Sequence, residues 1–159
     1  ALGEREVEKR AHAMSEATDG QPAAAIELAD GTIVTGKTGP LLGAASSALL
    51  NALKKLAGID QEIDLVSARA IEPIQTLKTN YLGSRNPRLH TDEVLIALSI
   101  CAVNEPKAAL ALKQLEKLKC CEVHSTVILS SVDENVFKKL GINLTCEARY
   151  ETKKLFHRN

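Results

Sequence analysis

The sequence predicts an α/β fold, specifically a three-layer α/β/α domain built around a mixed sheet. Two β-prone runs near the amino end flank a tight turn, which indicates an antiparallel hairpin. Toward the carboxyl end strands alternate with helices, and a helical crossover returns the chain to a parallel strand. The length of 159 residues is that of one domain, so we expect residues 1–159 to form a single α/β domain.

The first part of the chain is predicted to hold a helix, the hairpin and a second helix. Residues 2–17 combine strong helix formers with dense mixed charge, and Thr-Asp-Gly at 18–20 ends that helix. The runs AAAIEL and TIVTGK flank Asp30-Gly31, a strong turn signal. A helix is predicted over residues 40–57, because Pro is favoured in a first helical turn and Gly just after a last one.

The middle of the chain is predicted to form a strand, a helix, a loop and another helix. Residues 62–66, EIDLV, are predicted to be a short strand, and a helix with the sequence ARAIEPIQTLKT follows it. The segment YLGSRNPRLHTDE is a polar loop. Residues 94–103 are apolar on every side, which favours a buried helix capped by Thr91 or Asp92.

The last part of the chain is predicted to alternate helices and strands. The expected elements are a leucine-rich helix over 106–118, a strand over 121–129, a helix over 130–140 ended by Gly141, and a final strand in INLTCEAR. His124 is expected in the middle of its strand on the face of Glu122 and Thr126, where a single His is usually structural.

Composition excludes several classes of function. Lys plus Arg and Asp plus Glu number 20 each, so the long-range attraction that nucleic acids and anionic membranes require is missing. No apolar run approaches the roughly 20 residues of a membrane-spanning helix, and the first residues lack the core of a secretory signal. We therefore expect a cytoplasmic protein that binds neither nucleic acid nor a membrane.

One motif matches a phosphate loop letter by letter. Residues 31–38, GTIVTGKT, satisfy the pattern G-x-x-x-x-G-K-[ST]. A true phosphate loop wraps an anion with consecutive N–H groups, whereas Thr-Ile-Val-Thr is β-branched throughout and is predicted to lie in the hairpin. We expect no ATPase here, but Lys37 and Thr38 at the mouth of the next helix remain candidate anion ligands.

A second motif gathers charge into the nine residues RNPRLHTDE. In one interpretation Arg85 and Arg88 clamp an anion, while His90 carries a proton and forms a candidate catalytic pair with Glu93. His90 and Glu93 also have the spacing of half a metal site, but a second pair of ligands is missing, so no metal is expected. In the alternative interpretation this segment only caps a helix and forms ordinary ion pairs.

Three long stretches carry a resemblance to a known family. They are DGTIVTGKTGPLLGAASSALLNALKKLAGI, YLGSRNPRLHTDEVLIALS and EVHSTVILSSVDENVFKKLGINLTCEARYETKKL. They resemble the carboxy-terminal portion of the uncharacterised bacterial proteins known as domain of unknown function 1846, over most of residues 23–155. Members are substantially longer, so the resemblance implies that this chain is the carboxy-terminal part of a longer protein and that an amino-terminal region contributes to any active site.

The element order more distantly resembles the cytidine-deaminase-like fold. Deaminases hold zinc with a His or Cys at one helix start and with P-C-x-x-C at the next. Residues 44–47, AASS, and 67–70, SARA, stand at about these locations and include no ligand. The resemblance therefore implies the topology without zinc-dependent deamination, and neither a metal nor another cofactor is expected.

Two hypotheses about function follow. In the first, Lys37, Thr38, Ser67, Arg85 and Arg88 contribute to a cleft for a small anionic, nucleotide-like metabolite at the carboxyl ends of the strands, completed by the amino-terminal region. In the second, the domain is structural: the helices at 94–103 and 106–118 bury apolar faces against the amino-terminal region or against a second copy in a homo-oligomer.

Overall fold

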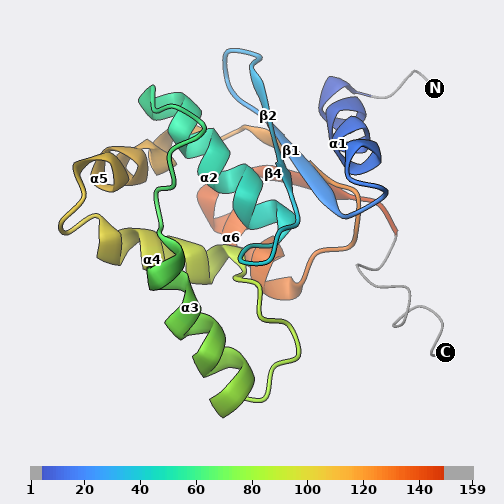
Figure 1. Cartoon of the computed structure of the whole chain (residues 1–159). Coiled ribbons are helices and arrows are strands. Elements are labelled where there is room, and N and C mark those ends of the chain that lie inside the picture. Colours follow the sequence, from blue (N-terminus) through green and yellow to red (C-terminus); the bar gives the residue numbers. More distant parts are fainter. Residues whose placement is uncertain (1–4, 149–159) are drawn as a thin grey trace, which may run out of the picture.

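The computed structural model describes residues 5–148, and it confirms an α/β fold with a mixed sheet (Figure 1). The strands are β1 (Ala23–Glu27), β2 (Ile33–Lys37), β3 (Glu122–Ser125) and β4 (Asn143–Cys146). The helices are α1 (Glu6–Ala17), α2 (Ala44–Ala57), α3 (Ala68–Thr76), α4 (Thr91–Cys101), α5 (Pro106–Leu112) and α6 (Ser131–Leu140). A π-helical turn, Leu77–Tyr81, extends α3, and a 3₁₀ segment, Lys113–Leu118, extends α5.

The sheet has the strand order β2-β1-β3-β4. Strand β1 is antiparallel to both of its neighbours, and β3 and β4 are parallel and joined through α6, so the predicted hairpin and crossover are confirmed. Ala25 is opposite His124, and His124 is opposite Thr145. Because side chains alternate along a strand, these three residues share one face of the sheet.

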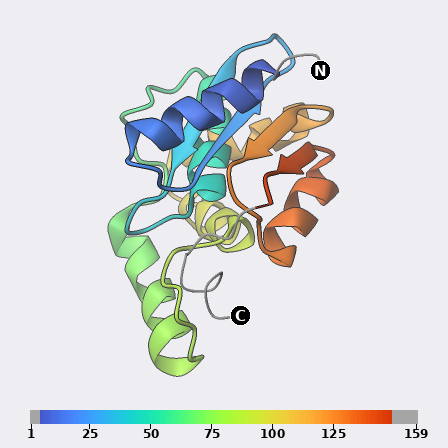
Figure 2. The same cartoon turned by 90° about the vertical axis from the view of Figure 1, so that its right-hand side faces the viewer.

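Helices cover both faces of the sheet, which gives three layers. Helix α1 lies across one face, where Val7 and Ala11 pack on Ala25 (Figure 2). The larger core lies on the other face, where α2 packs on β1 and β2, and α4, α5 and α6 complete the layer. Both views place α3 and the loop after it in a projection that points away from the sheet (Figures 1 and 2).

Gly36 allows α2 to lie directly on β2. A Cβ atom built at this position would lie 2.2 Å from the backbone nitrogen of Ala48 and 2.6 Å from the carbonyl oxygen of Ala44. Only a residue without a side chain therefore fits between the strand and the helix. This contact fixes the first turns of α2 beside the end of β2.

The strand predicted over residues 62–66 is wrong, because this segment is irregular. Leu65 and Val66 are nevertheless buried in the main core. The buried ammonium of Lys54 donates hydrogen bonds to the carbonyl oxygens of Gln61 and Ile63, at 2.8 and 3.0 Å. A side chain thus satisfies backbone groups that a sheet would otherwise have to pair.

Other predicted elements form with shifted ends. The second helix begins at Ala44 and not at 40, and the strand predicted over 121–129 ends at Ser125, whose hydroxyl bonds the backbone of Val127. The helix ends at Gly58 and Gly141 are confirmed, since both glycines adopt the left-handed conformation. Residues 2–4 of the first predicted helix lie outside the described residues.

Within residues 5–148, no helix is both long enough and apolar enough to cross a membrane. The cytidine-deaminase-like topology and the cytoplasmic location stay predictions.

Candidate functional site

Three helices begin at one edge of the sheet. Strands β2, β3 and β4 all end there, because β1 alone runs in the opposite direction. A pocket of 60 Å³ at this edge, called the edge pocket below, is lined by residues from the starts of α2, α4 and α6. These residues are Gly43, Ala44, Ala45, His90, Ser130 and Asp133. Ligands of open α/β sheets gather at edges of this kind.

Three of the residues predicted for an anion cleft also line the edge pocket, namely Thr38, Arg88 and His90. The Arg88 Nε donates a hydrogen bond of 2.6 Å to the carbonyl oxygen of Gly39. Among the described residues, its two terminal nitrogens have no hydrogen-bond partner. Arg88 is therefore anchored at one nitrogen and keeps its charged end available to an anion.

The start of α2 differs from the other two helix starts because no side chain caps it. The N-cap residue is Gly43, and the first turn contains no acidic residue. Within the described residues, the N–H groups of Ala44 and Ala45 have no hydrogen-bond partner. Unpaired N–H groups at a helix start carry partial positive charge, so this helix start favours an anion.

The starts of α4 and α6 are tied together by Asp133. Its Oδ1 accepts hydrogen bonds from the backbone N–H of Thr91 at 2.8 Å and from the hydroxyl of Thr91 at 2.6 Å. Both residues are buried. Asp133 itself lies in the first turn of α6, which Ser130 caps. The Asp133 carboxylate thus already accepts hydrogen bonds from the first residue of α4. Of these three helices, α2 is the one whose start has no side-chain hydrogen bond.

Glu93 positions His90 at the edge pocket. The Glu93 Oε1 accepts hydrogen bonds of 2.8 Å from the His90 N–H and from the buried ammonium of Lys78, which also bonds the carbonyl oxygen of Arg88 at 2.5 Å. Burial raises the pKa of Glu93, but the hydrogen bonds from Lys78 and His90 outweigh burial, so the pKa lies below its usual value. These contacts make Glu93 a positioning residue for the loop that carries Arg88 and His90.

The other predicted site residues lie elsewhere. Lys37 lines a second pocket of 440 Å³ between β2, α2 and α3. Ser67 caps α3, with its hydroxyl oxygen 3.2 Å from the N–H of Ala70, and lies between two residues that line the second pocket. Arg85 is exposed and lines neither pocket. The structure therefore divides the predicted cleft between two places.

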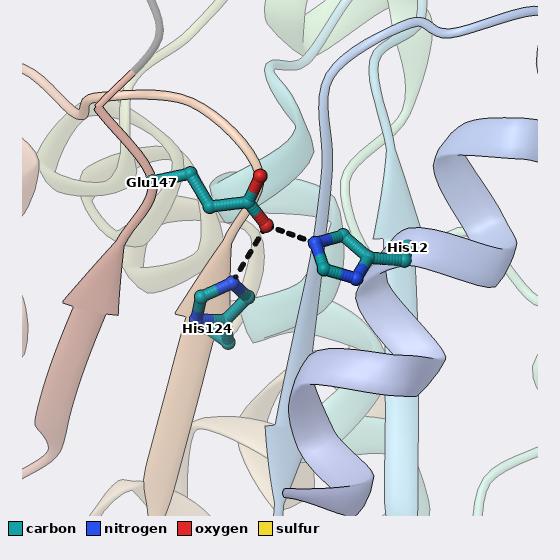
Figure 3. A group of neighbouring side chains, drawn as sticks. All are labelled: His12, His124 and Glu147. Carbon is teal, nitrogen blue, oxygen red and sulfur yellow. Dashed lines mark hydrogen bonds and ion pairs between the residues drawn. The ribbon is translucent and has the colours of Figure 1, made fainter. Parts of the chain in front are cut away.

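A separate cluster of side chains lies under α1 (Figure 3). Glu147 Oε2 contacts Nε2 of His12 and lies 3.0 Å from Nε2 of His124. The two imidazole rings meet edge to face, with centroids 5.9 Å apart. Burial raises the pKa of Glu147, but hydrogen bonds from His124 and His12 outweigh it and hold the pKa below its usual value.

Sequence reasoning missed two members of this cluster. His124 was expected to be structural, and His12 and Glu147 were not singled out at all. His12 is 112 residues from His124 in the chain, and no local pattern links them. Only the pairing of β3 with β4 indicates that Glu147, two residues after Thr145, lies on the face of His124.

Comparison with known proteins gives a family match over nearly the whole chain. Residues 3–156 match the model described as "Domain of unknown function DUF1846, C-terminal". A UPF0371 protein of Corynebacterium glutamicum is 56% identical over 155 residues, which are 98% of this chain and 31% of that protein. A UPF0371 protein of Streptococcus thermophilus is 49% identical over 155 residues, again 98% of this chain and 31% of the relative. The chain thus spans less than a third of the length of these relatives.

Proposed function

The chain belongs to the family described as domain of unknown function DUF1846, C-terminal, and from the geometry of its sheet edge we propose that it forms one wall of a binding site for a small anionic, nucleotide-like metabolite. The observation that carries the proposal is the uncapped start of α2 beside the free guanidinium end of Arg88. Helix starts bind phosphate groups through their N–H groups and dipole, and Arg adds a charge-assisted hydrogen bond.

The size of the edge pocket indicates how much of the ligand this domain holds. Its 60 Å³ is far below the roughly 300–1,000 Å³ of a complete small-molecule site. It suits one anionic group, with Arg88 as charge clamp, Thr38 as a hydroxyl ligand and His90 as proton carrier. We propose that the rest of the ligand is covered by a region that corresponds to the part of the longer relatives outside the match.

The test is a matched pair of arginine variants in the full-length protein. Arg88→Gln is expected to weaken binding of ATP or inorganic phosphate about 10-fold or more, because a hydrogen bond to a charged group contributes about 1.5–3 kcal/mol. Arg85→Gln removes the same charge from an exposed position of the same loop and is expected to leave the affinity unchanged. Isothermal titration calorimetry with each probe measures the difference.

Two results contradict the anion site. If Arg88→Gln and Arg85→Gln lower the affinity equally, only general charge attraction is present. If neither phosphate nor ATP binds the wild-type protein, the edge pocket does not bind an anion of this class.

A second candidate function rests on the surface of α4 and α5. Ile96 and Ile100 on α4 are 60% and 67% exposed, and these two residues are called the α4 patch below; Val103 after α4 and Leu110 on α5 are exposed as well. Ile96 and Ile100 are one helical turn apart and therefore lie on one side of α4. The 155 matched residues are 31% of the Corynebacterium glutamicum relative, which leaves about 345 of its residues outside the match. We propose that the α4 patch packs against the corresponding part of a longer protein.

Ile100→Glu in the full-length protein tests this contact. We expect the thermal midpoint to fall by several degrees, because a charge would then be buried in an apolar contact. Val132→Glu places the same charge at an exposed apolar position of α6 and is expected to change little. If both variants melt like the wild type, the α4 patch faces solvent; a mass that rises with protein concentration would assign it to a second copy of the chain.

A further inference from the structure

We propose that His12, His124 and Glu147 bind a divalent transition-metal ion, and that Zn²⁺ is the ion that fits them best. Within residues 5–148 they are the one group of three or more metal-ligating side chains whose donor atoms converge, all lying within 4.8 Å of one another. The site is independent of the proposed anion site, because it lies on the face of the sheet that α1 covers (Figures 2 and 3).

The three ligands come from three separate elements. His12 is on α1, His124 is in β3, and Glu147 follows β4 directly. Figure 3 shows the two imidazoles pointing toward the same carboxylate from different sides. His124 is fixed by the sheet and almost completely buried, while His12 and Glu147 keep 37% and 27% of their side-chain surface exposed. The arrangement thus has a rigid base and an open side through which an ion can enter.

Thr145 fixes the orientation of the His124 ring. Its Oγ1 lies 2.7 Å from Nδ1 of His124 and accepts a hydrogen bond of 2.7 Å from Arg5. Nδ1 of His124 therefore has a hydrogen-bond partner within the protein, and Nε2 is the nitrogen turned toward His12 and Glu147. A metal-binding imidazole is oriented in this way by a partner on its other nitrogen.

With Nδ1 of His124 held by Thr145, Nε2 is the ring nitrogen that faces the Glu147 carboxylate, at 3.0 Å. In the absence of metal this contact is a hydrogen bond, and a bound ion would take the place of its proton. A dication between the three groups would be held by both imidazoles and by the negative charge of the carboxylate.

The donor set indicates the kind of ion. Two imidazole nitrogens and one carboxylate oxygen are ligands that Zn²⁺ accepts in tetrahedral sites, and they suit Mg²⁺ and Ca²⁺ poorly because those ions prefer all-oxygen shells. Three protein ligands leave the fourth position of a tetrahedral ion for water or a substrate group. The expectation that the chain holds no metal came from residues 44–47 and 67–70 and from the lack of a second ligand pair beside His90 and Glu93, and the cluster of His12, His124 and Glu147 lies elsewhere in the fold.

The experiment measures metal binding by the untagged full-length protein. After removal of bound metal with a chelator, titration with Zn²⁺ is expected to give one ion per chain and to raise the thermal midpoint, because the ion binds only the folded state. Co²⁺ in place of Zn²⁺ is expected to give the strong visible absorption of a tetrahedral site. His12→Gln and Glu147→Gln are each expected to weaken binding by at least about 100-fold, since even indirect partners of a ligand contribute about 10–100-fold.

Two further variants separate a metal site from a structural role. Thr145→Val removes the partner of His124 Nδ1 and is expected to weaken Zn²⁺ binding about 10-fold without touching the ion. His90→Gln removes an imidazole at the edge pocket and is expected to leave Zn²⁺ binding unchanged. The proposed metal site and the proposed anion site are therefore tested independently. His12→Gln alters a partly exposed helix position, so it tests the site even if substitution of buried His124 prevents folding.

Two outcomes would overturn the proposal. In one, the folded wild-type protein binds no Zn²⁺ and shows no change in thermal midpoint at millimolar Zn²⁺. In the other, one Zn²⁺ binds, but His12→Gln and Glu147→Gln bind it as tightly as the wild type does, which would place the ion elsewhere.

Discussion

Gly36→Ala is expected to lower the free energy of unfolding by about 3 kcal/mol or more. The new methyl group would lie 2.2 Å from the backbone nitrogen of Ala48 and 2.6 Å from the carbonyl oxygen of Ala44. Both atoms belong to the backbone of α2, so no side-chain rotation relieves the clash. Either α2 moves away from β2, or the strand leaves its ladder with β1.

Gly39→Ala is the matched control for this change. An added Cβ at Gly39 meets no atom within 4 Å, so its cost is expected to stay within about 0.5 kcal/mol. Urea denaturation of the 159-residue chain, followed by circular dichroism, measures both variants. Equal stability of the two variants would mean that α2 does not pack against β2 at this distance.

Asp133→Ala is expected to cost about 3 kcal/mol, because it leaves two donors of Thr91 without an acceptor and each buried unpaired group costs about 1–3 kcal/mol. Thr91 is completely buried, so water cannot replace the lost carboxylate. The change also separates the starts of α4 and α6, which Asp133 joins. The edge pocket is expected to lose its shape together with this stability.

Two substitutions show whether the hydrogen bonds cause the loss. Asp133→Asn keeps an oxygen acceptor of the same shape and is expected to lose less stability than Asp133→Ala. Glu134→Ala removes a carboxylate from the adjacent, exposed position of α6 and is expected to stay within about 0.5 kcal/mol. The same denaturation measurement serves here. A loss in Glu134→Ala as large as that in Asp133→Ala would point to a general effect of charge on α6.

The two changes concern the same region of the molecule. Gly36 fixes where α2 starts, and Asp133 fixes where α4 and α6 start relative to each other. Gly36 does not line the edge pocket, and the Asp133 carboxylate, which does, is hydrogen-bonded to Thr91. Both hold helix starts whose N–H groups must face one place for an anion to bind there.

Local signals predicted much of the fold. The hairpin around Asp30 and Gly31 and the helix ends at Gly58 and Gly141 depend on backbone conformations that neighbouring residues specify. The segment 62–66 was predicted wrongly as a strand. Its apolar residues Leu65 and Val66 are buried as in a strand, but its backbone does not pair with another strand. Hydrogen bonds from Lys54, on another element, take the place of that pairing. No composition or periodicity within the segment contains that information.

The candidate site was predictable only in part for the same reason. Thr38, Arg88 and His90 do line one pocket. Thr38 directly follows β2, and Arg88 and His90 directly precede α4, which begins at the same edge of the sheet. Lys37 is the last residue of β2 and lines the other pocket, since successive residues of a strand point to opposite faces.

By itself, the sequence determined the α/β class and the family. It also determined those helix ends and turns that depend on short-range sterics and capping. Tertiary structure alone decided that α2 starts without a cap beside Arg88 and that His12, His124 and Glu147 meet. The physical reason is that strand pairing and helix packing bring together groups that are distant in the chain, such as His12 and Glu147, which are 135 residues apart, and such contacts leave no spacing pattern along the chain.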